Sequence, residues 1–287
     1  MVWKNKKRVV LIAGPTASGK SALAIEIATA ENGVIINADS MQVYQELQVL
    51  TARPTAQDEA KLSHRLYGHV SGAQPYSVAR WQGEAMAAVE TVHEADKLPI
   101  LCGGTGLYFM SLIKGLAEVP EPAPEVRNHW RSHSGDLHAE LAARDPVAAA
   151  RLHPSDRQRL IRALEVVDST GISLHEWQAR AEAAAPLRDF DVKKLFKTAA
   201  RDVLYQRANS RFAHMLEQGA LDEVRGLPTL EPAAPLMKAI GVPELLAHIK
   251  GETTLDEARN LAQIATRNYI KRQLTWARGQ MANWAEV

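Results

Sequence analysis

Short runs of apolar, mostly β-branched residues alternate along the chain with longer segments whose apolar residues recur at helical spacing. The short runs lie within residues 9–13, 33–40, 98–102 and 193–200. A helical segment extends from Ser77 to about Glu94, and a longer one from about Thr254 to Met281. Strands that alternate with helices predict a parallel sheet with helices on both of its faces.

One stretch departs from this alternation. Residues 119–126 contain three prolines and predict a linker. From Pro124 to about Ala185 the segments are helix-like by apolar spacing and alanine content, and none has the pattern of a good strand. The candidate helix signals are N-caps at Asp136, Ser155 and Ser173 and a stop at Gly171. We therefore predict an all-helical insertion.

The first apolar run leads directly into GPTASGKS, which has the G-x-x-x-x-G-K-[ST] pattern of a P-loop between a strand and a helix. Its glycines let successive backbone N–H groups point inward, and the helix dipole adds positive potential, so the loop predicts an anion site. Lys20 supplies a mobile cation, and Ser21 supplies a hydroxyl suited to Mg²⁺. The residues of the loop are Gly14, Pro15, Thr16, Ala17, Ser18, Gly19, Lys20 and Ser21.

Two other apolar runs end in polar or glycine-rich residues. Asp39 and Ser40 follow the second run, and a Gly-Gly-Thr-Gly turn at residues 103–106 follows the third. Because the carboxyl ends of parallel strands share one edge of a sheet, we expect these loops beside the P-loop and Asp39 close to the phosphate. The alternative for Asp39 is a cap of the following helix or turn.

The fold class predicted from these patterns is α/β, with a P-loop NTPase-like parallel sheet core flanked by helices. Residues 1–118 and 188–287 form this core, and residues 119–187 form the helical insertion domain. The predicted helix after the last strand run carries Arg207 and Arg211, which are four residues apart and can present two guanidinium groups to one anion.

Composition narrows the protein class. The chain has 287 residues, of which 46% are hydrophobic, enough for a packed core. The single cysteine, Cys102, excludes an intrachain disulfide framework and a cysteine-rich zinc site, and the simplest role for it is a small buried residue. No apolar run approaches the roughly 18 residues of a membrane span, so we expect a cytoplasmic protein without a membrane partner.

Net charge does not point to nucleic acid, but its distribution is uneven. The formal net charge is +1, whereas the C-terminal helical segment concentrates Arg267, Lys271, Arg272 and Arg278 with little acid nearby. In the insertion, Arg159 and Arg162 share one helix face, and pairing with Glu165 on a solvated face is an equal alternative to polyanion binding. From the residues alone we infer a P-loop protein that acts on a phosphorylated small molecule.

Seven sequence blocks then give a specific resemblance. GPTASGKS, NADSMQVY, TARPT, LCGGTGLY, HPSDRQRLIRALEV, KAIGVPE and TRNYIKRQLTW occur in the order and spacing of tRNA dimethylallyltransferases, and the similarity extends from about Arg8 to Arg278. The resemblance implies transfer of a dimethylallyl group from dimethylallyl diphosphate to N6 of the adenosine immediately 3′ of the anticodon (adenosine 37), with release of diphosphate. The implied partners are the tRNA anticodon stem-loop and dimethylallyl diphosphate, and the implied cofactor is Mg²⁺.

The resemblance also implies roles for individual residues. The P-loop would hold the diphosphate, Lys20 and Arg211 would neutralise charge on the leaving group, and Ser21 would ligate Mg²⁺. Asp39 would be the general base for N6, and Thr105 would contact the substrate beside the adenine. The implied tRNA contacts are Asp39, Ser40, Met41, Gln42, Thr105, Arg127, Gln158, Arg159, Leu160, Ile161, Arg162, Ala239, Ile240, Gly241, Val242, Pro243, Glu244, Lys271, Arg272, Gln273, Leu274, Thr275, Trp276, Ala277 and Arg278.

Some positions depart from the family pattern. Val242 and Pro243 follow Ile240-Gly241 where a tyrosine is common, Ala208 replaces a usual isoleucine, and Arg53 replaces a common lysine. The chain also ends soon after Trp284, without the zinc-finger extension of eukaryotic relatives, so a compact bacterial-type enzyme is implied, and we expect a monomer.

Three other functions remain as alternatives. A P-loop kinase of a small metabolite would use the same loop and Asp39, but would not need the cationic C-terminal helix. An adenylate isopentenyltransferase would share the donor but take a free nucleotide, which leaves the implied RNA contacts unused. The third alternative is a non-enzymatic, nucleotide-dependent RNA-binding switch, which catalytic turnover without hydrolysis of a nucleoside triphosphate would eliminate.

Overall fold

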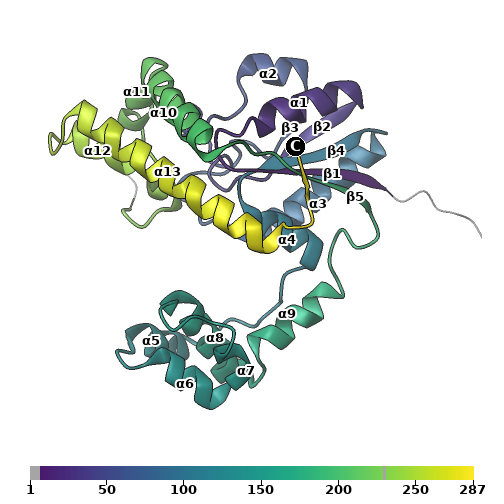
Figure 1. Cartoon of the computed structure of the whole chain (residues 1–287), viewed down its shortest axis with the longest axis vertical. Coiled ribbons are helices and arrows are strands. Elements are labelled where there is room, and N and C mark those ends of the chain that lie inside the picture. The colour runs from purple at the N-terminus through teal and green to yellow at the C-terminus, as the bar shows by residue number, and fades with distance from the viewer. Residues whose placement is uncertain (1–6, 229–230) are drawn as a thin grey trace, which may run out of the picture. The chain divides into compact units, whose positions relative to one another are not determined.

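The structure is a computed structural model that describes residues 7–228 and 231–287 (Figure 1). It divides into two compact units, which we call the core unit (Met1–Met110 with Asp189–Val287) and the insertion unit (Ser111–Arg188). No helix in the described part of the chain combines the length and apolar character that a membrane crossing requires.

A six-stranded parallel sheet forms the centre of the core unit, with strand order β3-β2-β4-β1-β5-β6. The strands are β1 (Arg8–Ala13), β2 (Gly33–Asn37), β3 (His64–Arg65), β4 (Leu98–Gly103), β5 (Asp191–Phe196) and β6 (Ala285–Glu286). The four longer strands and the parallel α/β fold confirm the sequence prediction. The pattern missed β3 and β6 because two residues are too short to show a period.

Helices cover both faces of this sheet (Figure 1). The helices of the core unit are α1 (Lys20–Ala30), α2 (Ala56–Lys61), α3 (Val78–Glu94), α10 (Arg201–Glu217), α11 (Ala220–Arg225), α12 (Val242–Ile249), α13 (Leu255–Gln280) and the 3₁₀ helix η1 (Pro235–Lys238), and α4 (Gly106–Lys114) crosses into the insertion unit. β2 and β4 are buried at every position, as expected for parallel strands covered on both sides. Ala24 and Ala28 of α1 pack on Val10, Ile35 and Ile100 of the sheet.

A second apolar cluster joins α10 to α13 with the segment after β2. Phe212 and Met215 of α10 are buried with Val43 and Leu47, and Leu216 packs against them. These three α10 residues form the core-facing side of the helix. The cluster holds α13 along the edge of the sheet where the strands end.

The insertion unit has its own core. Its helices are α5 (Pro124–Ser132), α6 (Leu137–Arg144), α7 (Pro146–Ala149), α8 (Arg157–Thr170) and α9 (Leu174–Glu182), and residues 111–188, all described, contain no strand. Trp130, Leu141 and Leu164 pack at its centre. The structure confirms the N-caps Asp136 and Ser173 and the left-handed stop at Gly171.

The predicted cap at Ser155 is wrong. Asp156 is the N-cap of α8, and its carboxylate accepts a hydrogen bond from the backbone N–H of Arg159. The Ser155 hydroxyl is instead bonded to the His153 ring at 2.8 Å. Both residue types are good caps, so the sequence alone did not decide between adjacent candidates.

Candidate active site

The P-loop occupies the turn between β1 and α1 and needs glycine at both ends for different reasons. A Cβ at Gly14 would lie 2.2 Å from the carbonyl oxygen of Lys197, at the end of β5. Gly19 has a φ of 88° and caps α1 in the left-handed conformation. The Ser18 hydroxyl is buried and has no hydrogen-bond partner within the described residues. The loop thus offers a buried donor and the orphan N–H groups of a helix start.

Two cations lie against this loop. Lys20 Nζ donates to the carbonyl of Pro15 at 3.3 Å, and the Arg211 guanidinium donates to the Thr16 hydroxyl. Burial lowers the pKa of both Lys20 and Arg211, and the nearby Asp39 carboxylate opposes this effect in each. Neither cation forms an ion pair with any residue that the structure describes. Two cations near one carboxylate leave the site electropositive.

Asp39 follows β2 in a loop that holds its carboxylate on one side. Its backbone N–H donates to Asn37 Oδ1 at 2.8 Å, and Asn37 Nδ2 donates to the carbonyls of Asp39 and Leu66. Asp39 Oδ1 accepts from the Met41 N–H at 3.0 Å, so this oxygen caps a turn, as the alternative reading predicted. Oδ2 lies 3.2 Å from the position a Cβ of Gly104 would occupy. The carboxylate therefore has one oxygen fixed by the turn and the other directed toward the glycine-rich turn.

The turn at residues 103–106 contacts this loop through Thr105. The Thr105 hydroxyl accepts from the Ser40 N–H at 2.9 Å and donates to the Ser40 hydroxyl at 3.3 Å. Its own N–H donates to the Ala38 carbonyl. These bonds exist because β2 and β4 are neighbours in the sheet, so their carboxyl ends meet. The three predicted loops do meet at one edge.

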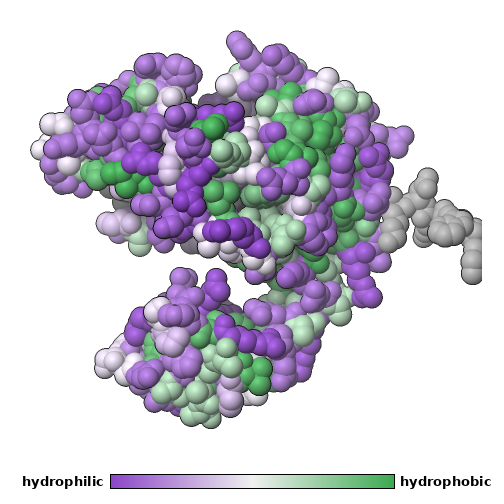
Figure 2. All heavy atoms as spheres, viewed as in Figure 1, coloured by the Kyte–Doolittle hydropathy of each residue, from purple (hydrophilic) through white to green (hydrophobic). Residues whose placement is uncertain are grey.

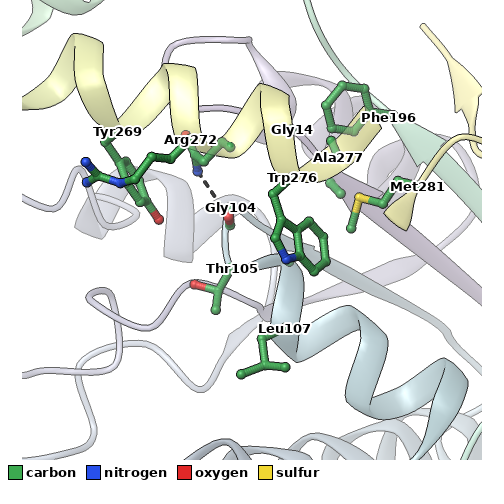
Figure 3. A pocket seen from close by; sticks show the side chains of 13 residues that line it. Gly14, Gly104, Thr105, Leu107, Phe196, Tyr269, Arg272, Trp276, Ala277 and Met281 are labelled. Atoms are coloured by element: carbon green, nitrogen blue, oxygen red, sulfur yellow. Dashed lines mark hydrogen bonds between the residues drawn. The ribbon is translucent and has the colours of Figure 1, made fainter. Parts of the chain in front are cut away.

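Two cavities open beside these loops. The cavity that we call the Asp39 pocket has a volume of about 250 Å³ and is lined by Thr16, Asp39, Ser40, Met41, Leu50, Thr51, Ala208, Arg211, Phe212, Met215, Lys238, Ala239, Ile240, Thr266, Tyr269 and Arg272. The one that we call the Trp276 pocket has a volume of about 230 Å³ and is lined by Ala13, Gly14, Gly104, Thr105, Gly106, Leu107, Phe196, Tyr269, Arg272, Gln273, Trp276, Ala277 and Met281 (Figure 3). Tyr269 and Arg272 of α13 contribute to both cavities.

Sequence reasoning missed several lining residues. Phe196, Leu107 and Met281 line the Trp276 pocket (Figure 3). The Tyr269 ring lies under the Arg272 guanidinium, with 5.6 Å between the guanidinium carbon and the ring centroid. Apolar residues at helical spacing are more often core than site, so composition gave no signal for them. Tyr269 lies within the TRNYIKRQLTW block and could have been found there.

The other predicted residues of the core unit lie in different environments. Lys271, Thr275 and Arg278 are exposed on α13, and Figure 2 shows mostly hydrophilic side chains along that helix. Ala277 lines the Trp276 pocket, and Leu274 packs beside α10.

The predicted residues outside α13 have partners within the core unit. Gln42 donates to the carbonyls of Thr51 and Ala52, and Glu244 accepts from the Gly241 N–H. Val242 is fully buried, and Pro243 is exposed.

The predicted residues of the insertion lie on α5 and α8. Gln158 and Arg159 are exposed, Leu160 is buried in the core of this unit, and Ile161 packs against it. Arg159 pairs with Asp156 at 3.3 Å, Arg162 with Glu165 at 3.8 Å, and Arg127 with Glu121 at 3.6 Å. In the core unit, Arg207 is exposed and lines neither pocket, so it does not join Arg211 at one anion site.

The donor set for a metal is small. Within the described residues, no group of three or more His, Cys, Asp or Glu side chains could hold a metal ion. Ser21 has its exposed hydroxyl in the first turn of α1. One hydroxyl fits a Mg²⁺ ion that takes its other ligands from phosphate oxygens and water, as Mg²⁺ does when it binds with phosphorylated substrates. Buried Cys102 is no ligand, because burial raises the pKa of its thiol to about 12.

Known proteins resemble this chain over nearly its full length. It is 52% identical to a tRNA dimethylallyltransferase of Rhodopseudomonas palustris (strain BisB18), covering 99% of this chain and 92% of the relative, and 50% identical to one of Azorhizobium caulinodans, covering 97% and 91%. Its fold is similar to the crystal structure of the full-length tRNA isopentenylpyrophosphate transferase of Bacillus halodurans, with 34% identity, a TM-score of 0.70 and coverage of 98% and 90%. It is also similar to a eukaryotic dimethylallyltransferase captured acting on tRNA, with 30% identity, a TM-score of 0.82 and coverage of 94% and 70%.

A family model extends this similarity to a defined group. The model of the family described as IPP transferase matches residues 42–280, which is most of the chain, although it begins after the P-loop. The relatives and the solved structures cover the P-loop as well. The chain therefore belongs to the IPP transferase family.

Proposed function

We propose that this chain transfers a dimethylallyl group from dimethylallyl diphosphate to N6 of the adenosine immediately 3′ of the anticodon in tRNA. The observation that carries the proposal is the contact of Lys20 and Arg211 with the P-loop, through Pro15 and Thr16, beside a pocket that Asp39 also lines. Burial lowers the pKa of both cations. Such a site has positive charge for a leaving diphosphate and a carboxylate for a proton. Membership in the IPP transferase family supports the reaction class.

The P-loop holds the diphosphate of the donor. Its orphan N–H groups and the Ser18 hydroxyl face a ligand that carries negative charge, and Lys20 and Arg211 neutralise the charge that grows as the C–O bond breaks. Because both cations are desolvated and lack ion-pair partners in the described chain, their charge is available to the substrate. The bond from C1 of the dimethylallyl group to oxygen breaks with its electron pair leaving on the diphosphate.

Asp39 takes the proton from the acceptor. The N6 lone pair forms the new bond to C1, and N6 then loses one proton to the Asp39 carboxylate. The Met41 N–H holds this carboxylate in place, Asn37 holds the Asp39 backbone, and Thr105 fixes the adjoining Ser40. The Asp39 pocket, with Phe212 and Tyr269 among its walls, accommodates an adenine that has been extruded from the anticodon loop.

Mg²⁺ fits this site as a cofactor. Ser21 is the residue that would hold the ion, and the bound ion would supply additional charge neutralisation to the diphosphate oxygens. The remaining steps rely on the side chains described above.

The two units divide the binding work in this proposal. The catalytic domain predicted from the sequence, residues 1–118 and 188–287, carries out the transfer. The predicted insertion domain, residues 119–187, contacts tRNA through Arg127, Arg159 and Arg162. The cationic face of α13 contributes Lys271, Arg272 and Arg278 to the same substrate. We place the enzyme in the cytoplasm as a monomer.

The proposal is tested by supplying the protein with Mg²⁺, radiolabelled dimethylallyl diphosphate and either unmodified tRNA or AMP. We expect label to enter tRNA alone, at the anticodon loop. Label in AMP would assign the chain to the free-nucleotide isopentenyltransferases. No transfer to either acceptor, together with nucleotide-dependent phosphorylation of a metabolite, would indicate a kinase.

A further inference from the structure

Gln273 lies where α13 passes both the P-loop and the turn at residues 103–106, and its side-chain amide joins them. Its Oε1 accepts a hydrogen bond from the Thr16 backbone N–H at 3.0 Å. Its Nε2 donates to the Gly104 carbonyl at 3.0 Å, the dashed line in Figure 3. The amide is therefore occupied by contacts within the protein.

The glycine-rich turn is shaped around this amide. A Cβ on Gly104 would lie 2.5 Å from Gln273 Nε2 and 3.2 Å from Asp39 Oδ2. No real Cβ approaches another atom as closely as the first of these distances, so a side chain at position 104 would push the amide away. The glycine is thus required by the bridge as well as by the neighbouring carboxylate.

The bridge connects the two halves of the proposed reaction centre. On the donor side it fixes Thr16, whose hydroxyl accepts from Arg211. On the acceptor side it fixes Gly104, the residue before Thr105, which in turn holds Ser40. The Thr16 N–H is also used by Gln273, so the diphosphate must bind the later N–H groups of the loop.

We infer that Gln273 is a positioning residue that sets the distance between the P-loop and the turn at residues 103–106, rather than a residue that contacts tRNA. The inference rests on the proposed function, because it gives the bridge a donor side and an acceptor side. Lys271, two residues away on α13, is exposed and lines neither pocket, so it provides the matched comparison for a tRNA contact.

The test compares Gln273→Leu, Gly104→Ala and Lys271→Leu in the full-length chain. Gln273→Leu approximately keeps the volume of the side chain and removes the hydrogen bonds to Thr16 and Gly104. Gly104→Ala leaves Gln273 in the sequence but pushes its amide out of position. Affinity for dimethylallyl diphosphate is measured by calorimetry, affinity for unmodified tRNA by filter binding without donor, and KM for each substrate in the transfer assay. Circular dichroism melts establish that each variant is folded.

For both bridge variants we expect donor affinity to fall and donor KM to rise on the order of tenfold, the effect of losing about one hydrogen bond. Their tRNA affinity should stay within about twofold of wild type, a change in binding free energy smaller than the contribution of one hydrogen bond. Lys271→Leu should instead lower tRNA affinity and leave donor affinity and donor KM unchanged. A Gln273→Leu variant that loses tRNA affinity with unchanged donor affinity, or that changes neither, would overturn the inference. If Gln273→Leu does not fold, Gly104→Ala decides by the same criteria, and failure of wild type to label tRNA identifies an error in the proposed function instead.

Discussion

The cations of the P-loop site and those of the insertion are held in opposite ways. Lys20 and Arg211 are partly buried, have lowered pKa values and have no ion-pair partner in the described chain. Arg159 and Arg162 of α8 lie at the surface, and each is paired with a carboxylate on its own helix or its cap. The first arrangement costs stability and leaves charge available to a small ligand. The pair of Arg159 with Asp156 costs little, because exposed ion pairs are worth about 0–1 kcal/mol, whereas the Glu165 carboxylate that pairs with Arg162 is buried.

This difference corresponds to the two substrates that we propose. A diphosphate buries its charge inside the protein, so its binding site needs cations that are already stripped of water and of competing anions. A tRNA backbone is long and stays hydrated, so arginines can exchange an intramolecular carboxylate for a phosphate at small cost. Four substitutions test the contrast, from the largest expected effect to the smallest.

Asp39→Ala removes the carboxylate whose negative charge acts on both Lys20 and Arg211. We expect the single-turnover rate of transfer to fall on the order of 10²-fold or more, the scale of general-base loss, while tRNA affinity stays within about tenfold. Donor affinity should be unchanged or higher, because the positive charge of Lys20 and Arg211 is then unopposed. Rapid-quench measurement with saturating donor gives the rate, and an unchanged rate would remove Asp39 from the mechanism.

Lys20→Met removes a desolvated cation. Donor affinity should fall about 10- to 100-fold, as expected for loss of a charge-assisted hydrogen bond, whereas the free energy of unfolding of the ligand-free chain should rise. The folded-state pKa of Lys20 lies below its ordinary value of 10.5. At a pH between the folded-state pKa and 10.5, the unfolded chain binds more protons than the folded chain, so the stability of the wild type increases with pH. The stability advantage of the variant is therefore greatest at neutral pH and disappears as the pH approaches 10.5.

Denaturant melts of wild type and Lys20→Met at several pH values, without donor, measure this advantage. A variant that is less stable than wild type at neutral pH would show that the ammonium group is not held at a cost.

Arg159→Ala removes an exposed cation, whose side chain is 67% accessible, from the insertion. We expect tRNA affinity to fall on the order of threefold to tenfold and the slope of log K against log salt to decrease by about one, because one phosphate contact is lost. Donor KM and thermal stability should stay as in wild type. Filter binding over a salt series gives the slope, and a slope equal to that of wild type would exclude a phosphate contact.

Asp156→Ser is the mildest of the four changes. Serine preserves the N-cap of α8 but removes the carboxylate that holds Arg159. We expect tRNA to bind about two- to threefold more tightly, because Arg159 is freed and a negative charge near the RNA is lost, an effect of the size of one exposed ion pair. Combining it with Arg159→Ala should cancel this gain, and a gain that persists in the double variant would point to another cause.

The core strands and the P-loop could be predicted because each is a local pattern. The run before Gly14 is apolar and β-branched, and the spacing of Gly14, Gly19 and Lys20 is specific to one kind of loop. The seven sequence blocks are likewise local, and together they indicate the family from the sequence alone. The side-chain contacts of the site were harder to predict. Arg207 and Arg211 are four residues apart, a spacing that allows both to bind one anion, yet of these two only Arg211 contacts the P-loop.

The sequence by itself determined the alternation of strands and helices, the anion-binding loop, the helical insertion and the family, because periodicity, glycine spacing and ordered blocks are properties of the chain. Only the tertiary structure decided how α13 meets the loops. Gln273 is 257 residues from Thr16 and 169 from Gly104, and nothing in their local sequences encodes the hydrogen bonds between them. It likewise decided that Lys20 and Arg211 form no ion pair within the described residues, while Arg159 and Arg162 each form one. Desolvation and pairing depend on which distant elements pack together, and that is fixed when the cluster around α10 and α13 closes against the sheet edge.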